Sequence, residues 1–219
     1  MSEIARVQQY FTRSATVFDS LYADNATALA KWVNRNFRRD IYERFRLSVE
    51  HVERHGLRTA LDVGCGSGRY QFGLARIGVR RIVGIDVSPV MIQLARGLSK
   101  GVVSSSVSLE FMNERFETFQ TKESFDVVLA MGFFDYIQDQ IPVLQRMGEL
   151  ANHSVIASFP SISWYRTPIR KIRYFAKRCP VYFYKRKDID SFAKAAGFAR
   201  NETLKIDGAG QDYFVAFFK

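Results

Sequence analysis

The chain has 219 residues, enough for one domain with a sizeable core, alone or with a cap. With 47% hydrophobic and 25% charged residues, its composition is that of an ordinary soluble globular protein. No apolar run approaches the ~20 residues of a membrane span, so stable membrane insertion is not expected. Two cysteines are too few for a zinc cluster or a disulfide framework, so no metal is expected. The absence of a signal peptide predicts a cytoplasmic location.

A helical cap is predicted for residues 1–56, ahead of a core over residues 57–219. Apolar residues of the cap recur at four-residue steps, as in Val33, Phe37 and Ile41. We therefore expect helices through most of this region.

The end of this cap carries charged and histidine residues at helical spacing. Opposite charges alternate with the apolar stripe over residues 38–45, which predicts a solvated face. His51 and His55 are four residues apart, but no third metal ligand is in view. Their expected role is favourable charge at the C-terminus of the helix.

A glycine-rich stretch links a short apolar strand, residues 59–63, to a helix that starts near Tyr70. Gly64, Gly66 and Gly68 allow a sharp turn that brings backbone N–H groups against a ligand. A dinucleotide fingerprint would need a glycine at position 69, where the chain has an arginine, so hydride transfer is disfavoured.

Asp62 lies at the end of this first strand. A carboxylate there fits poorly against a pyrophosphate, but it suits a ligand that presents an ammonium group, as S-adenosylmethionine does. The small side chain of Cys65 is expected to be tucked against the sheet, because nothing nearby in sequence would lower its pKa.

A second apolar strand, residues 81–86, ends in Asp86, about twenty residues beyond the glycine loop, where an acid can bind two ribose hydroxyls. A helix follows over residues 87–96, with Ser88 as its cap and Pro89 at its first position.

These motifs resemble the Rossmann-like, class I S-adenosylmethionine-dependent methyltransferases, on the residues Leu61-Asp62-Val63-Gly64-Cys65-Gly66-Ser67-Gly68 and the acid Asp86. The resemblance implies an α/β fold with a doubly wound, mostly parallel seven-stranded sheet, an antiparallel last strand and the helical cap. It implies S-adenosylmethionine as cofactor. The residues expected to contact it are Tyr22, Arg39, Asp62, Gly64, Cys65, Gly66, Gly68, Asp86, Val87, Met91, Glu114, Arg115 and Met131.

Three of these assignments carry alternatives. Tyr22 either stacks on the cofactor or packs between two cap helices, and Arg39 either contacts the cofactor or lies on the solvated face. After the third strand, predicted for residues 109–113, Arg115 stands where the resembled family has an acid beside the adenine. The adenine contact then falls to Glu114, to backbone near Arg115, or to water.

The clearest central strand covers residues 124–132, and the residues at its carboxyl end should border cofactor and substrate. Phe134 is expected to contact the substrate. Asp135 and Tyr136 are candidates for a catalytic base, which a hydroxyl or ammonium acceptor requires and a carboxylate acceptor does not. His153, at the opposite end of the sheet, is expected to be structural.

A basic insert follows the fifth strand, over residues 161–187, with nine lysines and arginines, no acid, and interleaved aromatic residues. Such a segment suits a small acidic substrate, because guanidinium groups clamp carboxylates or phosphates and rings cover apolar portions. The candidate substrate-binding residues of the insert are Tyr165, Arg166, Arg170 and Arg173.

Beyond the cofactor motifs, the chain looks like the magnesium-protoporphyrin O-methyltransferases and related bacterial enzymes, on Asp19-Ser20-Leu21-Tyr22, Ser158-Phe159-Pro160 and Ala196-Gly197-Phe198. This resemblance implies methylation, favouring oxygen, of a carboxylate or hydroxyl on a small biosynthetic intermediate. The basic insert predicts that this intermediate is acidic, and a monomer or homodimer is expected.

Two other functions fit parts of the sequence. The net charge of +10 and the basic insert would suit an RNA methyltransferase, although no appended RNA-binding module is visible and no nucleic-acid partner is expected. The insert could instead place a non-enzymatic protein with the cofactor fold on an anionic membrane surface.

Overall fold

The computed structural model describes residues 6–9, 39–100, 106–162, 167–168, 172, 179–206 and 212–219. Five predicted site residues lie outside these ranges: Tyr22, Tyr165, Arg166, Arg170 and Arg173.

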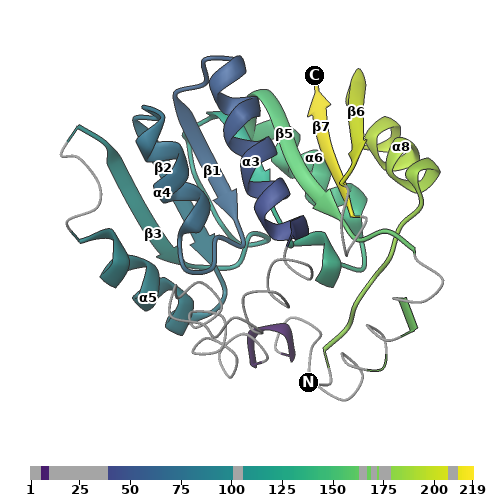
Figure 1. Cartoon of the computed structure of the whole chain (residues 1–219), viewed down its shortest axis with the longest axis horizontal. Coiled ribbons are helices and arrows are strands. Elements are labelled where there is room, and N and C mark those ends of the chain that lie inside the picture. Colours follow the sequence, from purple (N-terminus) through teal and green to yellow (C-terminus); the bar gives the residue numbers. More distant parts are fainter. Residues whose placement is uncertain are drawn as a thin grey trace.

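A seven-stranded sheet forms the centre of the molecule, in the order β3-β2-β1-β4-β5-β7-β6 (Figure 1). Strands β1 to β5 are parallel to one another, and β7 is antiparallel to both of its neighbours. This arrangement confirms the predicted fold class, with its single antiparallel strand last in the chain. The strands are β1 Thr59–Val63, β2 Arg81–Asp86, β3 Ser108–Asn113, β4 Phe125–Ala130, β5 Ala151–Phe159, β6 Arg200–Lys205 and β7 Tyr213–Phe218.

Helices connect β1 to β2, β2 to β3 and β4 to β5, as parallel neighbours require, whereas no helix lies between β3 and β4. The elements are α3 Arg39–Arg54, α4 Arg69–Arg76, α5 Pro89–Ser99, the 3-10 turn η1 Phe134–Tyr136, α6 Gln140–Leu150 and α8 Arg186–Ala195. Ser88 caps α5 as predicted, because its side chain accepts a hydrogen bond from the Met91 backbone. Among the described residues, no helix has the length and apolar character needed to cross a bilayer.

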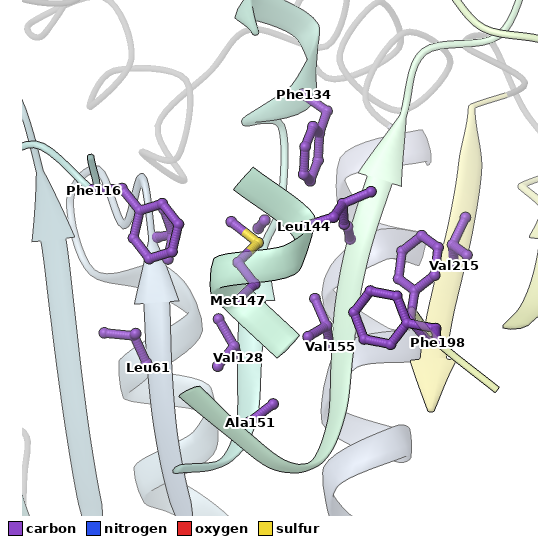
Figure 2. Packing of buried hydrophobic residues seen from close by; sticks show 14 of the residues in the cluster. Leu61, Phe116, Val128, Phe134, Leu144, Met147, Ala151, Val155, Phe198 and Val215 are labelled. Atoms are coloured by element: carbon purple, nitrogen blue, oxygen red, sulfur yellow. The ribbon is translucent and has the colours of Figure 1, made fainter. Parts of the chain in front are cut away.

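The hydrophobic core has a layer on each face of the sheet, because strand side chains alternate between the faces. On one face Leu61, Val128 and Val155 pack with residues of α6 and α8, including Leu144 and Met147 (Figure 2).

The opposite face is covered by α3 and α4. Val52 of α3 is fully buried with Leu74 of α4, against Val127 and Ile156 of the sheet. The last helix of the predicted cap therefore forms part of the layer that covers the sheet, and its position fixes which of its polar residues are buried.

Candidate active site

The glycine loop joins the carboxyl end of β1 to the start of α4, as predicted. Gly66 and Gly68 have φ angles of 54° and 87°, a region that side chains rarely adopt. A Cβ added at Gly68 would approach the Phe72 ring to 3.0 Å, whereas one added at Gly66 would meet nothing within 4 Å. The loop is therefore packed against side chains at Gly68, whereas the space around Gly66 is open.

Asp86 ties this loop to the end of β2. Its Oδ2 accepts a hydrogen bond from the Gly66 N–H at 2.9 Å, and its Oδ1 accepts one from the Ser88 N–H at 2.8 Å. Burial raises the pKa of the Asp86 carboxyl, and these two hydrogen bonds act in the opposite direction. Each oxygen keeps lone-pair capacity for a further donor, so the predicted hydrogen bonds to ribose hydroxyls are chemically possible.

Asp62 is the most demanding group of the site. Its residue is only 1% exposed, and its Oδ2 has no hydrogen-bond partner among the described residues. Burial, together with the charge of Asp86, raises the pKa of Asp62 to about 8. A buried oxygen in this condition requires a donor or a cation from a ligand.

Cys65 is buried in the loop between these two acids. Burial is the main reason that the pKa of its thiol is raised well above the ordinary value, and the negative charges of Asp62 and Asp86 add to it. A thiol that stays protonated is a poor nucleophile. Its place against the sheet, beside Gly84, agrees with the structural role expected from the sequence.

The remaining predicted cofactor contacts lie around α5 and the end of β3. Met91 is buried, and the Val87 carbonyl accepts a hydrogen bond from the Gln8 side chain at 2.9 Å. Arg115, by contrast, is 48% exposed at its side chain and pairs with Glu117 at 3.5 Å. Its guanidinium is therefore engaged at the surface, which leaves the backbone of this segment, with Glu114, as the candidate for the adenine.

The prediction that Phe134 contacts the substrate is wrong. Its side chain is fully buried and stacks on Phe159, with the ring centroids 4.6 Å apart, inside the core layer (Figure 2). Its neighbour Phe133 faces the site instead, because its ring would lie 3.0 Å from a Cβ added at Gly64. The two rings point in different directions because η1 turns the chain between them.

Asp135 and Tyr136 lie in η1, just beyond β4. Asp135 is buried, and its carbonyl accepts a hydrogen bond from the Tyr182 N–H at 2.9 Å. The Tyr184 hydroxyl donates to the Phe134 carbonyl at 2.9 Å. The far end of the basic insert thus packs on the turn that carries the candidate base.

A buried arginine beside this turn was missed by sequence reasoning. Arg44 of α3 lies 3.6 Å from the Asp40 carboxylate and 4.0 Å from that of Asp212, and its side chain is only 12% exposed. The expectation of a solvated face over residues 38–45 is therefore wrong for Asp40 and Arg44. Arg39, a candidate cofactor contact with the solvated face as its alternative, is exposed at the first position of the helix.

The helical spacing contained the missed signal. Arg44 precedes Ser48 by four residues and Val52 by eight, so all three belong to one stripe of α3. Ser48 and Val52 are fully buried, and the Ser48 hydroxyl donates to the Arg44 carbonyl at 2.7 Å.

The three histidines gather at the opposite, amino end of the sheet. The rings of His51 and His55, and those of His55 and His153, have centroids 4.7 Å apart. Burial and the neighbouring positive groups lower the pKa of His51 to about 4. The expectation of a charged His51 at the helix end is therefore wrong, whereas the structural place of His153 at this end agrees with the sequence. Within the described ranges, no three His, Cys, Asp or Glu residues could hold a metal ion.

Comparisons with known proteins give the site its context. The family described as "Methyltransferase domain" matches residues 55–180. The ubiquinone biosynthesis O-methyltransferase of Xanthomonas oryzae pv. oryzae is 26% identical over 157 residues, which cover 67% of this chain and 62% of that protein. The ubiquinone biosynthesis O-methyltransferase of Xanthomonas campestris pv. campestris is 25% identical over 162 residues, which cover 70% of this chain and 65% of that protein. The chain thus matches less than two thirds of the length of these relatives.

Among solved structures, the magnesium protoporphyrin IX methyltransferase of Synechocystis PCC 6803 with bound SAH superposes with a TM-score of 0.80. The match covers 100% of both chains at 19% sequence identity. At this identity, the likeness shows a shared fold over the whole chain.

Proposed function

Because the chain belongs to the methyltransferase domain family, we propose that it transfers a methyl group from S-adenosylmethionine to an oxygen atom of a small, acidic biosynthetic intermediate. The class of the protein, a class I S-adenosylmethionine-dependent methyltransferase, is confirmed by the family and the fold. The substrate and the acceptor atom are our proposal.

The observation that carries the proposal is the buried carboxylate oxygen of Asp62, on the strand that leads into the glycine loop, together with the open space at Gly66 of that loop. The ammonium group of the cofactor would supply the missing donor, and its ribose hydroxyls would donate to Asp86. The residues present therefore fit the cofactor, with two acids on either side of a glycine turn.

When bound, the cofactor supplies a methyl group on a sulfonium, whose leaving group is already activated. The protein then contributes mainly orientation and the exclusion of water. We assign the Phe133 ring, which packs on Gly64, to covering the loop on the acceptor side, where it would serve both purposes.

The acceptor side favours a hydroxyl. Asp135 and Tyr136 lie on the turn beyond β4, and we assign Asp135 as the base that takes the proton from the acceptor. The names of the relatives, which are O-methyltransferases, support oxygen as the acceptor atom. The acidic part of the substrate is assigned to Arg166, Arg170 and Arg173, with Tyr165 over its apolar part.

The function is tested with the purified protein, S-adenosylmethionine and a panel of acidic and hydroxylated metabolites, with S-adenosylhomocysteine as the readout. We expect turnover with a hydroxylated acid, and a loss of at least 100-fold in kcat in Asp135→Asn with unchanged cofactor affinity. Methyl incorporation into RNA, or no turnover with any acceptor despite tight cofactor binding, would contradict the proposal.

The role of the insert is tested separately by reversing the charges of Arg166, Arg170 and Arg173 together. Turnover should fall more than cofactor affinity, because these residues are assigned to the substrate. A triple reversal of Arg46, Arg76 and Arg80, which lie elsewhere on the chain, is the control for net charge. Equal loss of turnover and cofactor binding in the insert variant would remove the insert from the substrate site.

A further inference from the structure

Helix α3 and strand β5 are joined by two polar contacts, one near the middle of the strand and one near its carboxyl end. Arg44 Nη1 donates to Ser158 Oγ at 3.2 Å, and His51 Nε2 lies 2.9 Å from Ser154 Oγ. Ser154 and Ser158 are four residues apart on one strand, so both face α3. The two contacts are alike in construction and differ in their distance from the site.

The contact at Ser158 is held by a cation with little freedom. Arg44 is almost enclosed, with the carboxylates of Asp40 and Asp212 at 3.6 and 4.0 Å. Burial opposes its charge, but Asp212, Tyr70, Asp40 and Asp135 act together to raise its pKa above the ordinary value. Arg44 is therefore a permanent cation in a fixed environment of acids.

Ser158 connects Arg44 to the loop beyond β4. Its Oγ also accepts a hydrogen bond from the Gly132 N–H at 2.7 Å. Gly132 has a φ angle of 72°, and a Cβ there would lie 3.5 Å from Arg44 Nη1. Arg44 and Ser158 thus hold the one residue at which the chain leaves β4 in a left-handed conformation.

Two candidate site residues follow directly from this turn. Phe133 packs on Gly64 of the glycine loop. Asp135 lies two residues further along the chain, and its charge contributes to the raised pKa of Arg44. A change in the direction of the chain at Gly132 would displace both.

We propose that Arg44 is a positioning residue for methyl transfer, which acts through Ser158 to fix the turn at Gly132 and thereby the placement of Phe133 and Asp135. The inference rests on the proposed function for its kinetic part, and on the geometry alone for its structural part. Arg44 touches none of the groups assigned to the cofactor in Asp62, Gly66 or Asp86. Its loss should therefore affect turnover and not cofactor affinity.

The test compares Ser158→Ala with the control Ser154→Ala. Each variant removes one serine hydroxyl from the face of β5 that meets α3, and the control lies four residues nearer the amino end of the strand. In Ser158→Ala, we expect kcat to fall at least tenfold, since small misplacements of reacting groups are costly. The dissociation constant for S-adenosylhomocysteine, measured by calorimetry, should change less than threefold. Ser154→Ala should retain wild-type values of both.

A second pair of variants addresses the cation itself. Arg44→Lys keeps the charge but cannot reach Ser158 and both carboxylates at once, so it should reproduce the Ser158→Ala pattern. Arg46→Lys, on the exposed side of the same helix and paired with Glu43 and Glu50, is its control. Full activity in Arg44→Lys would overturn the proposal.

Hydrogen exchange of the peptide covering residues 130–137 gives a readout that needs no methyl acceptor. Exchange should be at least tenfold faster in Ser158→Ala and Arg44→Lys than in wild type, and unchanged in Ser154→Ala. Unchanged exchange in the first two variants, or an equal effect of Ser154→Ala, would overturn the positioning role. If wild type turns over no acceptor while the exchange pattern holds, the proposed function fails and the positioning of the turn stands.

Discussion

Two aspartates on neighbouring strands show how differently the two ends of this sheet use a carboxylate. Asp126 is the second residue of β4, and its Oδ2 accepts hydrogen bonds from the backbone N–H groups of Arg58 and Thr59 at 2.7 and 3.0 Å. Asp62 is the last but one residue of β1 and keeps an oxygen with no partner in the described structure. One acid completes the start of the sheet, and the other makes its carboxyl end ready for a ligand, at a cost in stability.

The variant Asp62→Asn tests the difference between the two aspartates most directly. Removal of one partner from a buried ion pair costs about 3–5 kcal/mol, so affinity for S-adenosylmethionine should fall by more than 100-fold. With its pKa raised to about 8, the Asp62 carboxyl must take up a proton to be buried at pH 7, which costs stability, whereas an amide needs none. The free variant should therefore be more stable by about 1–3 kcal/mol. Calorimetry and thermal unfolding without ligand measure the two effects. A variant that binds the cofactor normally would remove Asp62 from the site.

Asp86→Ala should produce the next largest loss. It removes charge-assisted hydrogen bonds to the ribose, worth about 1.5–3 kcal/mol, and it frees the Gly66 and Ser88 N–H groups that hold the loop. Cofactor affinity should fall by about 10- to 100-fold in calorimetry. Asp86→Asn keeps the shape of the side chain and one acceptor oxygen, so its cofactor affinity should lie between those of wild type and Asp86→Ala. Unchanged affinity in both would refute the ribose assignment.

Asp126→Ala should give the opposite pattern to Asp62→Asn. The variant leaves two backbone donors without their acceptor, which costs about 1–3 kcal/mol of unfolding free energy. Cofactor affinity of the folded protein should stay within twofold of wild type, because Asp126 lies at the other end of the sheet. Chemical denaturation and calorimetry on the same preparation make the test. A loss of affinity comparable to that of Asp86→Ala would show that the two ends are coupled.

The smallest expected effect is a pH dependence of cofactor affinity, which Asp62 should cause and Asp126 should not. With its pKa raised to about 8, Asp62 is protonated in the free protein at pH 7 and must lose that proton to pair with an ammonium group. Binding should therefore release a proton, and affinity should rise by up to about tenfold per pH unit between pH 6 and 7.5. Calorimetry in two buffers of different ionisation enthalpy measures the release. Asp62→Asn should abolish it, and Asp126→Ala should not.

The central strands and the acids at their ends could be predicted from sequence, because each depends on local chemistry. Apolar runs specify buried parallel strands, glycines specify the turn, and a carboxylate that directly follows a strand lies at the edge of the sheet. Asp62 and Asp86 are therefore brought together by rules that operate within thirty or so residues of chain, a span typical of one strand-helix-strand unit.

The side chains that complete the acceptor side could not be chosen in this way. Phe133 and Phe134 are adjacent and chemically identical, yet only the turn of η1 decides which of them enters the core. The positions of Tyr22 and of the basic residues in the insert remain predictions.

The sequence by itself determined the central strands, the glycine turn and the two acids that flank it, because these follow from periodicity and from residues close together in the chain. The fold class and the family followed from the resemblance that these motifs carry. Only the tertiary structure decided which arginine of α3 and which of its histidines are buried. Arg44 meets Ser158 across 114 positions and His51 meets Ser154 across 103, and burial and charge at such contacts depend on partners that local patterns do not specify.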